Sequence, residues 1–155
     1  MTQTRYIMLA MAGSAALLLG AWMFQFAGYA PCKLCVWQRW PHGAAVAIGL
    51  VALWMPAAIF LVAGALAALT TAGIGLYHTG IERAWWEGPD SCTSGDISDL
   101  STDALMDQIM SAPLVQCDVV AWQMLGLSMA SWNMVMSLVL AGLWACAYAK
   151  GRTNI

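Results

Sequence analysis

The sequence predicts an all-α membrane protein, a four-transmembrane-helix bundle with a long extracytoplasmic loop that contains a short amphipathic helix. Hydrophobic residues fill 61% of the 155 positions and charged residues only 9%, which leaves too little polar surface for a water-soluble globule. A formal charge of −2 offers no basic surface for nucleic acid. All eight acidic residues lie between Glu82 and Asp118, so one polar stretch interrupts the apolar sequence. We expect residues 1–155 to form a single transmembrane domain.

Four uncharged stretches are long enough to be transmembrane helices. Residues 6–30 carry no charge, and at about 1.5 Å per residue they can cross a hydrocarbon layer of roughly 30 Å. The uncharged run over residues 40–81 is too long for one helix, and Pro56 divides it because proline cannot continue a helix. The predicted spans are therefore residues 6–30, 36–55, 57–77 and 128–149.

The first span has an alternative interpretation as a cleaved signal peptide. Gly28, Tyr29 and Ala30 place small residues at cleavage-like positions. The apolar stretch is longer than the core of a usual signal peptide, which has about 7–15 residues. Its length therefore favours a retained helix, with cleavage as the alternative.

The polar segment over residues 78–127 is predicted to be the extracytoplasmic loop. Residues 101–110 place apolar side chains at helical spacing, with Asp103 and Asp107 on the opposite face, which predicts a short amphipathic helix on the bilayer surface. Four spans put both termini on one side of the membrane. The positive charges near the termini favour a cytoplasmic location, but an equal number on the other side makes the positive-inside count a tie. The residues counted are Arg5, Lys150 and Arg152 against Lys33, Arg39 and Arg83.

Four of the five cysteines are predicted to share one side of the membrane. Cys32 and Cys35 form a C-x-x-C motif after the first span, and Cys92 and Cys117 lie in the loop after the third span. Two crossings return the chain to the same face, so this placement does not depend on orientation. Cys146 lies near the far end of the fourth span, out of disulfide reach of the others, and we expect it to be dispensable.

A C-x-x-C motif indicates metal binding, haem attachment or dithiol redox chemistry. Haem attachment requires a histidine directly after the motif, where this chain has Val36. A zinc site made by the four cysteines is an alternative, although zinc usually uses compact pairs and Cys92 and Cys117 are 25 positions apart. A structural disulfide between these two would stabilise the fold by about 3 kcal/mol, but it would not explain the C-x-x-C motif.

Two cysteine pairs in an oxidising compartment can form a relay that passes reducing equivalents by thiolate exchange. Lys33, Arg39 and the positive end of the second span are expected to favour the thiolate of Cys35. Turnover requires an external electron acceptor, and the sequence has neither a nucleotide-binding G-x-G-x-x-G motif nor a haem motif. We therefore expect a membrane-soluble acceptor, and a quinone fits.

Two polar residues are candidates for binding that quinone. Arg39 at the membrane interface can stabilise negative charge on a quinone carbonyl as it is reduced; its alternative role is to anchor the second span. His78, at the outer end of the third span, can face the same pocket as a donor or proton carrier, and its alternative role is that of a polar anchor.

Three stretches of the sequence together resemble the disulfide bond formation protein B (DsbB) family of bacterial inner-membrane proteins. They are residues 32–35 with Gln38 and Arg39, residues 76–78 ahead of residues 85–89, and residues 117–118 leading into residues 125–129 and Trp132. The resemblance covers nearly the whole chain. It implies a bundle with cytoplasmic termini and periplasmic cysteine loops. Such a protein reoxidises a periplasmic thioredoxin-fold thiol oxidase (DsbA-like) and passes the electrons to ubiquinone or menaquinone.

The resemblance also implies a role for each paired cysteine. Cys92 would form the mixed disulfide with the soluble partner, and Cys117 would be its loop mate. Cys32 and Cys35 would reduce the quinone, and no residue would bind a metal.

The resemblance further implies that Cys35 lies nearest the quinone and that Arg39 and His78 line its site. Some family members have glutamate where this chain has Gln38, so a proton-transfer role does not carry over to this position.

Two other classes of protein are alternatives. A vitamin K epoxide reductase-like oxidoreductase also combines loop cysteines with a C-x-x-C motif and a quinone, but its C-x-x-C motif usually lies late in the chain. A non-catalytic metal-binding membrane protein would instead hold the thiols reduced around zinc.

Overall fold

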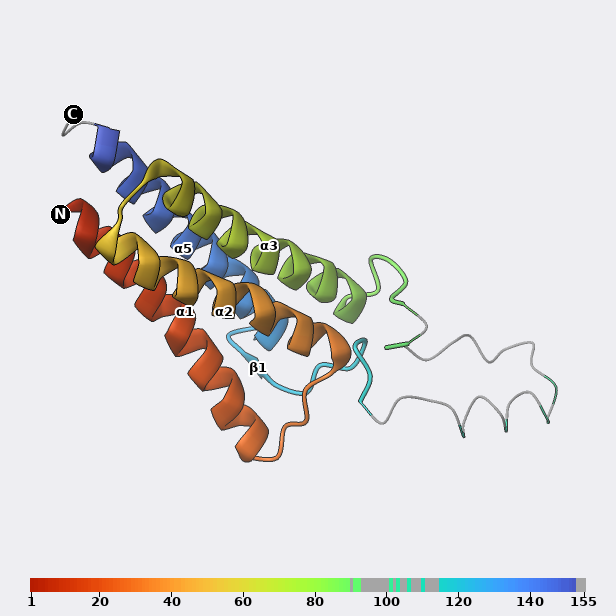
Figure 1. Cartoon of the computed structure of the whole chain (residues 1–155). Coiled ribbons are helices and arrows are strands. Elements are labelled where there is room, and N and C mark those ends of the chain that lie inside the picture. The colour runs from red at the N-terminus through yellow and green to blue at the C-terminus, as the bar shows by residue number, and fades with distance from the viewer. Residues whose placement is uncertain are drawn as a thin grey trace.

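The computed structural model describes residues 1–89, 91–92, 101, 103, 106, 110 and 115–152. Within this part of the chain, four long helices pack into a bundle (Figure 1). They are α1 (Gln3–Phe26), α2 (Lys33–Trp54), α3 (Ala58–Glu82) and α5 (Met129–Arg152). The helical architecture is therefore confirmed. The amphipathic helix predicted at residues 101–110 falls mostly on residues outside the described part.

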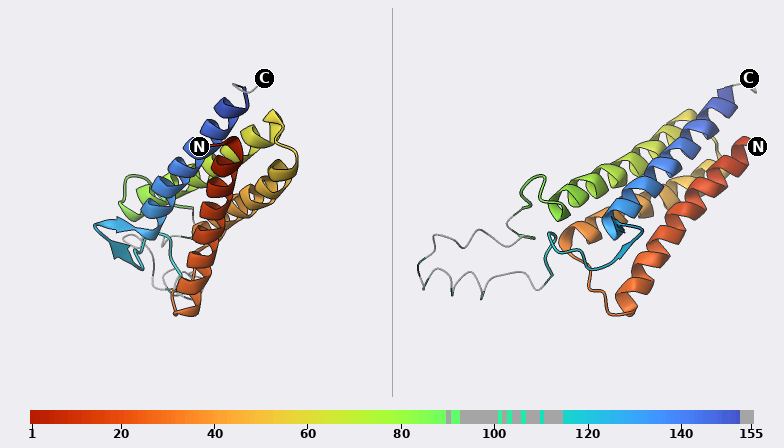
Figure 2. Two further views of the ribbon diagram at one scale, coloured as in Figure 1. Left: turned by 90° about the vertical axis from the view of Figure 1, so that its left-hand side faces the viewer. Right: turned by 180° about the vertical axis from the view of Figure 1, so that it is seen from behind.

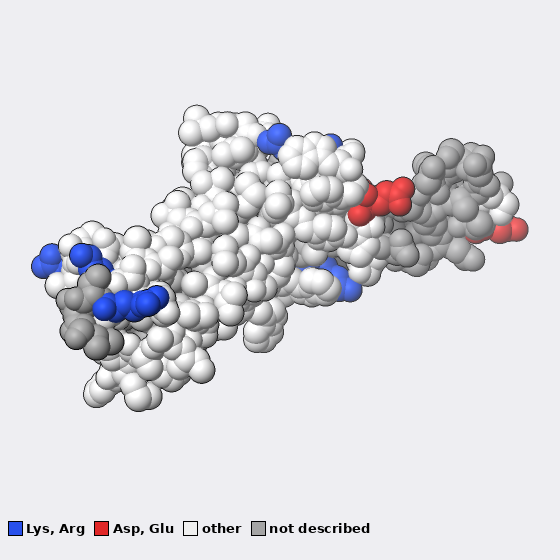
Figure 3. Space-filling model, turned by 90° about the horizontal axis from the view of Figure 1, so that it is seen from above, with Lys and Arg blue, Asp and Glu red and all other residues white. Residues whose placement is uncertain are grey.

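The two ends of the bundle differ in the chain segments and in the charged side chains that lie there. Both termini and the short α2–α3 connection lie at one end, whereas the α1–α2 connection and the end of α3 lie at the other (Figure 2). The space-filling view in Figure 3 shows basic side chains at the end that carries the termini, and both acidic and basic side chains toward the opposite end. The surface charges thus leave the positive-inside count as balanced as it is in the sequence.

Three of the four bundle helices, α1, α3 and α5, are long and apolar enough to cross a membrane. The fourth, α2, has 22 residues, and its first half carries Gln38, Arg39 and His42. These polar residues lower the hydropathy of α2, which is not among the three. They also mark the part of the bundle where the candidate site lies.

The helix boundaries depart from the predicted spans for local reasons. α1 ends at Phe26, four residues before the predicted end, and Gly28 turns the chain with a φ of 99°. The predicted break at Pro56 is confirmed, since α2 ends at Trp54 and α3 begins at Ala58. α3 continues to Glu82, five residues beyond the predicted end, and the added part of the helix carries three polar side chains, those of His78, Thr79 and Glu82.

Small residues allow α3 and α5 to pack closely. Trp144 of α5 is fully buried in the bundle core, and its ring lies directly over Gly64 of α3. A side chain at Gly64 would overlap that ring. Close packing of this kind holds the helices in a fixed arrangement.

A small hairpin precedes α5 and is a departure from the all-α expectation. Strand β1 (Gln123–Met124) pairs antiparallel with β2 (Leu127–Ser128). The two turn residues, Leu125 and Gly126, have φ values of 54° and 76°. Two positive φ values in sequence are typical of the tight turn that joins two antiparallel strands. The hairpin brings Ser128 back against the end of α3.

Candidate active site

The paired cysteines lie together at one end of the bundle, as the sequence predicted. Cys92 and Cys117 form a disulfide with their Cα atoms 5.3 Å apart. The sulfurs of Cys32, Cys92 and Cys117 all lie within 4.8 Å of one another, and all three residues are buried. The Sγ atom of Cys35 lies 3.0 Å from that of Cys32. The four sulfurs thus form a continuous group, with Cys32 between the loop disulfide and Cys35.

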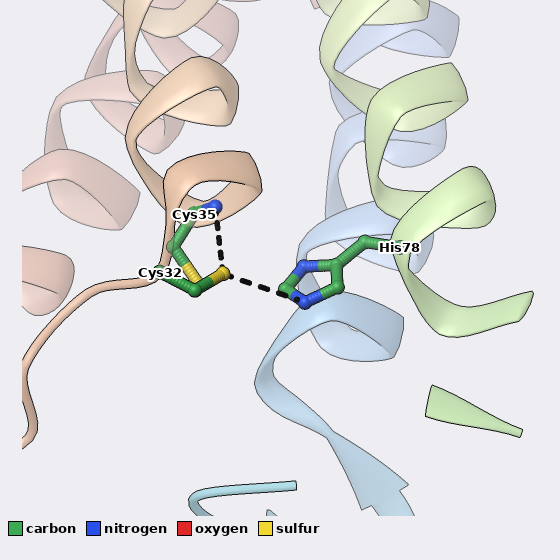
Figure 4. Close-up of side chains that lie close together, drawn as sticks. All are labelled: Cys32, Cys35 and His78. Carbon is green, nitrogen blue, oxygen red and sulfur yellow. Dashed lines mark hydrogen bonds between the residues drawn. The ribbon is translucent and has the colours of Figure 1, made fainter. Parts of the chain in front are cut away.

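Three hydrogen-bonding groups surround the sulfur of Cys32, among them the backbone N–H of Cys35 and the ring of His78 (Figure 4). Cys32 is the N-cap of α2, and its Sγ accepts a hydrogen bond from the backbone N–H of Cys35 at 3.3 Å. The thiol of Cys35 lies at 3.0 Å and the Nε2 atom of His78 at 3.6 Å. The bond from the Cys35 thiol, helped by that from His78, outweighs burial and lowers the pKa of Cys32 from 9.0 to about 4. These contacts favour Cys32 over Cys35 as the thiolate of the reduced pair.

This finding corrects the expectation that the thiolate would lie on Cys35. The helix begins one residue after Cys32, so its positive N-terminal end acts on Cys32 rather than on Cys35. The two cations invoked for Cys35 have other partners. The Nζ atom of Lys33 donates to Ser91 Oγ at 2.9 Å, and Arg39 donates to Gln25 Oε1 at 2.7 Å.

A buried hydrogen-bond network orients His78. The side-chain amide of Gln38 donates to Nδ1 of His78 at 3.0 Å, which leaves the ring proton on Nε2, the nitrogen that faces Cys32. Glu82 lies one turn later on α3, with Oε1 3.9 Å from the same Nε2. Ser128 of the hairpin donates to Glu82. Gln38, for which no role was predicted, thus helps to orient His78 toward the sulfur of Cys32.

A cavity of about 370 Å³ opens beside this network, between α1, α2, α3, α5 and the segment before the hairpin. A volume of this size is within the usual range of small-molecule sites. Aromatic and apolar side chains form most of the wall, with a few polar groups among them. Cys35, Arg39 and His78 all line the cavity, so the predicted quinone-site residues are brought together in one place. The polar lining residues are Gln38, Arg39, His42, His78, Glu82, Gln116 and Asn133.

Three of these lining residues were missed in the sequence, although each carried a signal. Glu82 follows His78 by four residues, which places both on one face of a helix. His42 follows Arg39 by three residues and so lies on the same face of α2. Asn133 is a polar residue within an apolar span, a position that often marks a functional site in membrane proteins.

The comparisons with known proteins agree with this arrangement. The family described as "Disulfide bond formation protein DsbB" matches residues 3–147. The chain belongs to the DsbB family. Together with the three apolar helices, this membership makes the protein a membrane oxidoreductase of disulfide formation. The DsbB match selects this family over the vitamin K epoxide reductase-like alternative.

An uncharacterized protein of Rickettsia prowazekii (strain Madrid E) is 28% identical to this DsbB-family chain over 116 residues. The alignment covers 72% of this chain and 67% of the relative. No solved structure matches the chain.

Replacing Cys146 by alanine is expected to leave electron transfer unchanged. Cys146 is exposed on α5, six residues before the helix ends at Arg152 and therefore near the C-terminal end of the bundle. Turnover of a soluble dithiol substrate by the purified variant is the measurement. A Cys35→Ala variant prepared in parallel serves as the inactive control. Loss of turnover in a correctly inserted Cys146→Ala variant would contradict the assignment of electron transfer to the other four cysteines.

Proposed function

We propose that this protein reoxidises a periplasmic thioredoxin-fold thiol oxidase (DsbA-like) and passes the electrons through two cysteine pairs to ubiquinone or menaquinone. The protein acts as one four-helix transmembrane domain over residues 1–155, in which α2 is the fourth span. Its termini are cytoplasmic and its cysteines periplasmic. The observation that supports this proposal is the row of sulfurs from Cys92–Cys117 through Cys32 to Cys35, which ends at the cavity.

The first step is a thiol–disulfide exchange at the loop disulfide. A thiolate of the partner attacks Cys92, which forms a mixed disulfide and releases Cys117 as a thiolate. The second thiol of the partner then resolves the mixed disulfide. The partner leaves oxidised, and two electrons remain on Cys92 and Cys117 as a dithiol.

The second step transfers these electrons to the inner pair. While the inner pair is still a Cys32–Cys35 disulfide, the Cys117 thiolate attacks Cys32, which releases Cys35 as a thiolate. Attack by Cys92 on Cys117 then restores the loop disulfide and frees Cys32. The short distances among the sulfurs of Cys32, Cys92 and Cys117 support this route. The structure corresponds to its end point, with the loop pair bonded and the inner pair reduced.

The residues around the cavity fit a quinone head group. The apolar wall suits a flat ring, and aromatic side chains such as Phe24 and Trp122 line it. The Nε atom of Arg39 is buried and has no hydrogen-bond partner among the described residues, so it can donate to a carbonyl oxygen. A quinone bound there supplies an acceptor for two electrons and two protons. Arg39 holds positive charge next to that acceptor, and Cys32 and Cys35 become a disulfide as the electrons leave.

Arg39 variants are expected to separate quinone recognition from helix anchoring. Arg39→Ala should lower kcat/KM for quinone by a factor that corresponds to about 1–3 kcal/mol, because a charge-assisted hydrogen bond is lost. Arg39→Lys should also lower it, because lysine snorkels as well but lacks the planar set of donors. Quinone-reduction kinetics over a range of quinone concentrations measure both effects.

Exchange at Cys92–Cys117, assayed separately with the soluble dithiol, is the control for the Arg39 variants and should not change. Unchanged quinone kinetics in Arg39→Lys would rule out specific recognition of the quinone by the guanidinium group. Unchanged kinetics in Arg39→Ala would remove Arg39 from the site.

The function itself is tested with purified components. A reduced thioredoxin-fold dithiol protein and a quinone are mixed with and without this protein in a lipid nanodisc, and quinone reduction is followed. We expect rapid reduction only when all three are present. A thiol count with and without a chelator tests the zinc alternative, because zinc would hold all four thiols reduced. Reduced thiols that resist oxidation until the chelator is added would contradict the relay.

A further inference from the structure

A second polar cluster lies deeper along the cavity than Cys35 and Arg39. Its centre is His42 of α2, which is 2% exposed and lines the cavity together with Asn133 of α5. His42 follows Cys35 by seven residues and Arg39 by three, so all three lie along one side of α2. The helical rise places His42 about 4.5 Å beyond Arg39 along the axis. This separation is comparable to that between the two oxygens of a quinone ring.

The hydrogen bonds around this cluster determine which nitrogen of His42 carries the proton. Thr71 Oγ1 donates to the backbone carbonyl of Gln38 at 3.1 Å, so its lone pairs are left to accept. The Nδ2 atom of Asn133 donates to Thr71 Oγ1 at 3.0 Å. The amide oxygen of Asn133 therefore faces His42, where it lies 2.9 Å from Nε2. Nε2 must be the donor in this contact, which leaves Nδ1 of the neutral ring as an acceptor.

The Nδ1 acceptor of His42 is buried and has no hydrogen-bond partner among the described residues. Buried polar atoms are nearly always paired, so an unpaired one beside a cavity indicates a group that a ligand supplies. Within the described part of the chain, Nε of Arg39 is the other unpaired buried atom from a residue that lines this cavity. One site thus offers a donor at Arg39 and an acceptor at His42.

We propose that His42 Nδ1 accepts a hydrogen bond from a hydroxyl of the quinol, and that the cavity therefore binds quinol more tightly than quinone. This inference rests on the proposed function. A quinone has two carbonyl oxygens, which only accept, so it can pair with Arg39 but not with the neutral ring of His42. A quinol also has hydroxyl hydrogens, so it can accept from Arg39 with one oxygen and donate to His42 with the other.

Preferential binding of quinol affects the direction of electron transfer. Within the site, a reduced cysteine pair with quinone is in equilibrium with an oxidised pair and quinol. A ligand state that binds more tightly shifts such an equilibrium by the ratio of the two affinities. His42 therefore favours oxidation of the Cys32–Cys35 pair, although it contacts neither sulfur.

The test is a comparison of quinol and quinone affinities in the full-length protein. A short-chain quinone is titrated into the oxidised protein, and the corresponding quinol into the fully reduced protein without oxygen, so that no electrons exchange. Binding is followed by quenching of tryptophan fluorescence, since Trp122 and Trp132 line the cavity. His42→Phe is expected to weaken quinol binding about tenfold, the effect of one hydrogen bond, and quinone binding less than about twofold.

Two further variants keep the test decisive if phenylalanine at this position prevents folding. Asn133→Ala leaves His42 in place but removes the acceptor for Nε2, so the ring proton is no longer held there, and quinol binding should weaken selectively. Ser137→Ala is the matched control, because its hydroxyl lies 3.5 Å from Nε2 of His42 but does not line the cavity. This control should bind both ligands as the wild type does.

The outcomes distinguish this inference from the proposed function. Selective loss of quinol affinity in His42→Phe or Asn133→Ala supports it. Equal changes for quinol and quinone, or no change in either variant, overturn it while wild-type quinone reduction still supports the proposed function. A wild-type protein that neither binds nor reduces quinone would overturn both.

Discussion

A Cys117→Ala variant is expected to become covalently attached to its soluble partner. Its Cys92 thiolate attacks the disulfide of an oxidised partner and forms a mixed disulfide, which releases one partner sulfur as a thiolate, and no loop mate is present to resolve this bond. With a partner that keeps only its attacking cysteine, supplied as a mixed disulfide with a small thiol that Cys92 displaces, most of the protein should run as the complex. Gel electrophoresis under non-reducing conditions measures the trapped fraction, and a reducing agent should release it.

The matched variant for this experiment is Cys92→Ala, which retains Cys117 but lacks the proposed attachment site. It should show little or no complex under the same conditions. Equal trapping by the two variants would show that Cys92 is not the specific docking cysteine. Trapping by Cys92→Ala alone would reverse the assigned order of the relay.

The reduced Cys32–Cys35 pair is expected to hold a thiolate across the physiological pH range. The pKa of Cys32 is lowered from 9.0 to about 4, so the charged form dominates above that value and is lost only in acid. An unperturbed thiol titrates near pH 8.5 and is almost fully protonated at pH 6, so the thiolate population of the pair should be much larger there than that of a free cysteine. Ultraviolet absorbance of the thiolate, followed from pH 9 to pH 3, measures the transition.

That titration is best made in a triple variant, Cys92→Ala, Cys117→Ala and Cys146→Ala, in which Cys32 and Cys35 are the cysteines that remain. Adding Cys35→Ala removes the thiol that makes the largest contribution and should move the transition to higher pH. His78→Phe should move it in the same direction by a smaller amount. A transition near pH 9 in the starting background would show that Cys32 lacks the donors described.

The helices of the bundle could be predicted closely because each depends on neighbouring residues. An uncharged run of the right length must bury its backbone groups within a helix when it enters lipid, and Pro56 ends a helix wherever it occurs. The common end of the two cysteine pairs followed from counting crossings. The helix boundaries differ from the predicted ones, since α1 ends early, just before Gly28, and α3 continues to Glu82.

The hairpin before α5 was not predicted, and its signal is weak. The turn places Leu125, a residue that rarely adopts positive φ, beside Gly126. Each strand has only two residues, so neither shows the alternating pattern that predicts a strand. The segment is held by tertiary contacts, among them the hydrogen bond from the Trp132 indole to the Met124 carbonyl at 3.1 Å.

The sequence by itself was enough to predict a helical membrane protein with a C-x-x-C pair, a second cysteine pair in a loop and candidate quinone-binding residues. These features follow from composition, length and motif spacing, which are properties of the linear chain. Only the tertiary structure decided which sulfur is the thiolate. The donors of Cys32 include His78, which is 46 positions away, and a hydrogen bond depends on distance and direction in space. Only the tertiary structure, likewise, brought His42 to Asn133 across 91 positions and left one nitrogen of its ring without a partner.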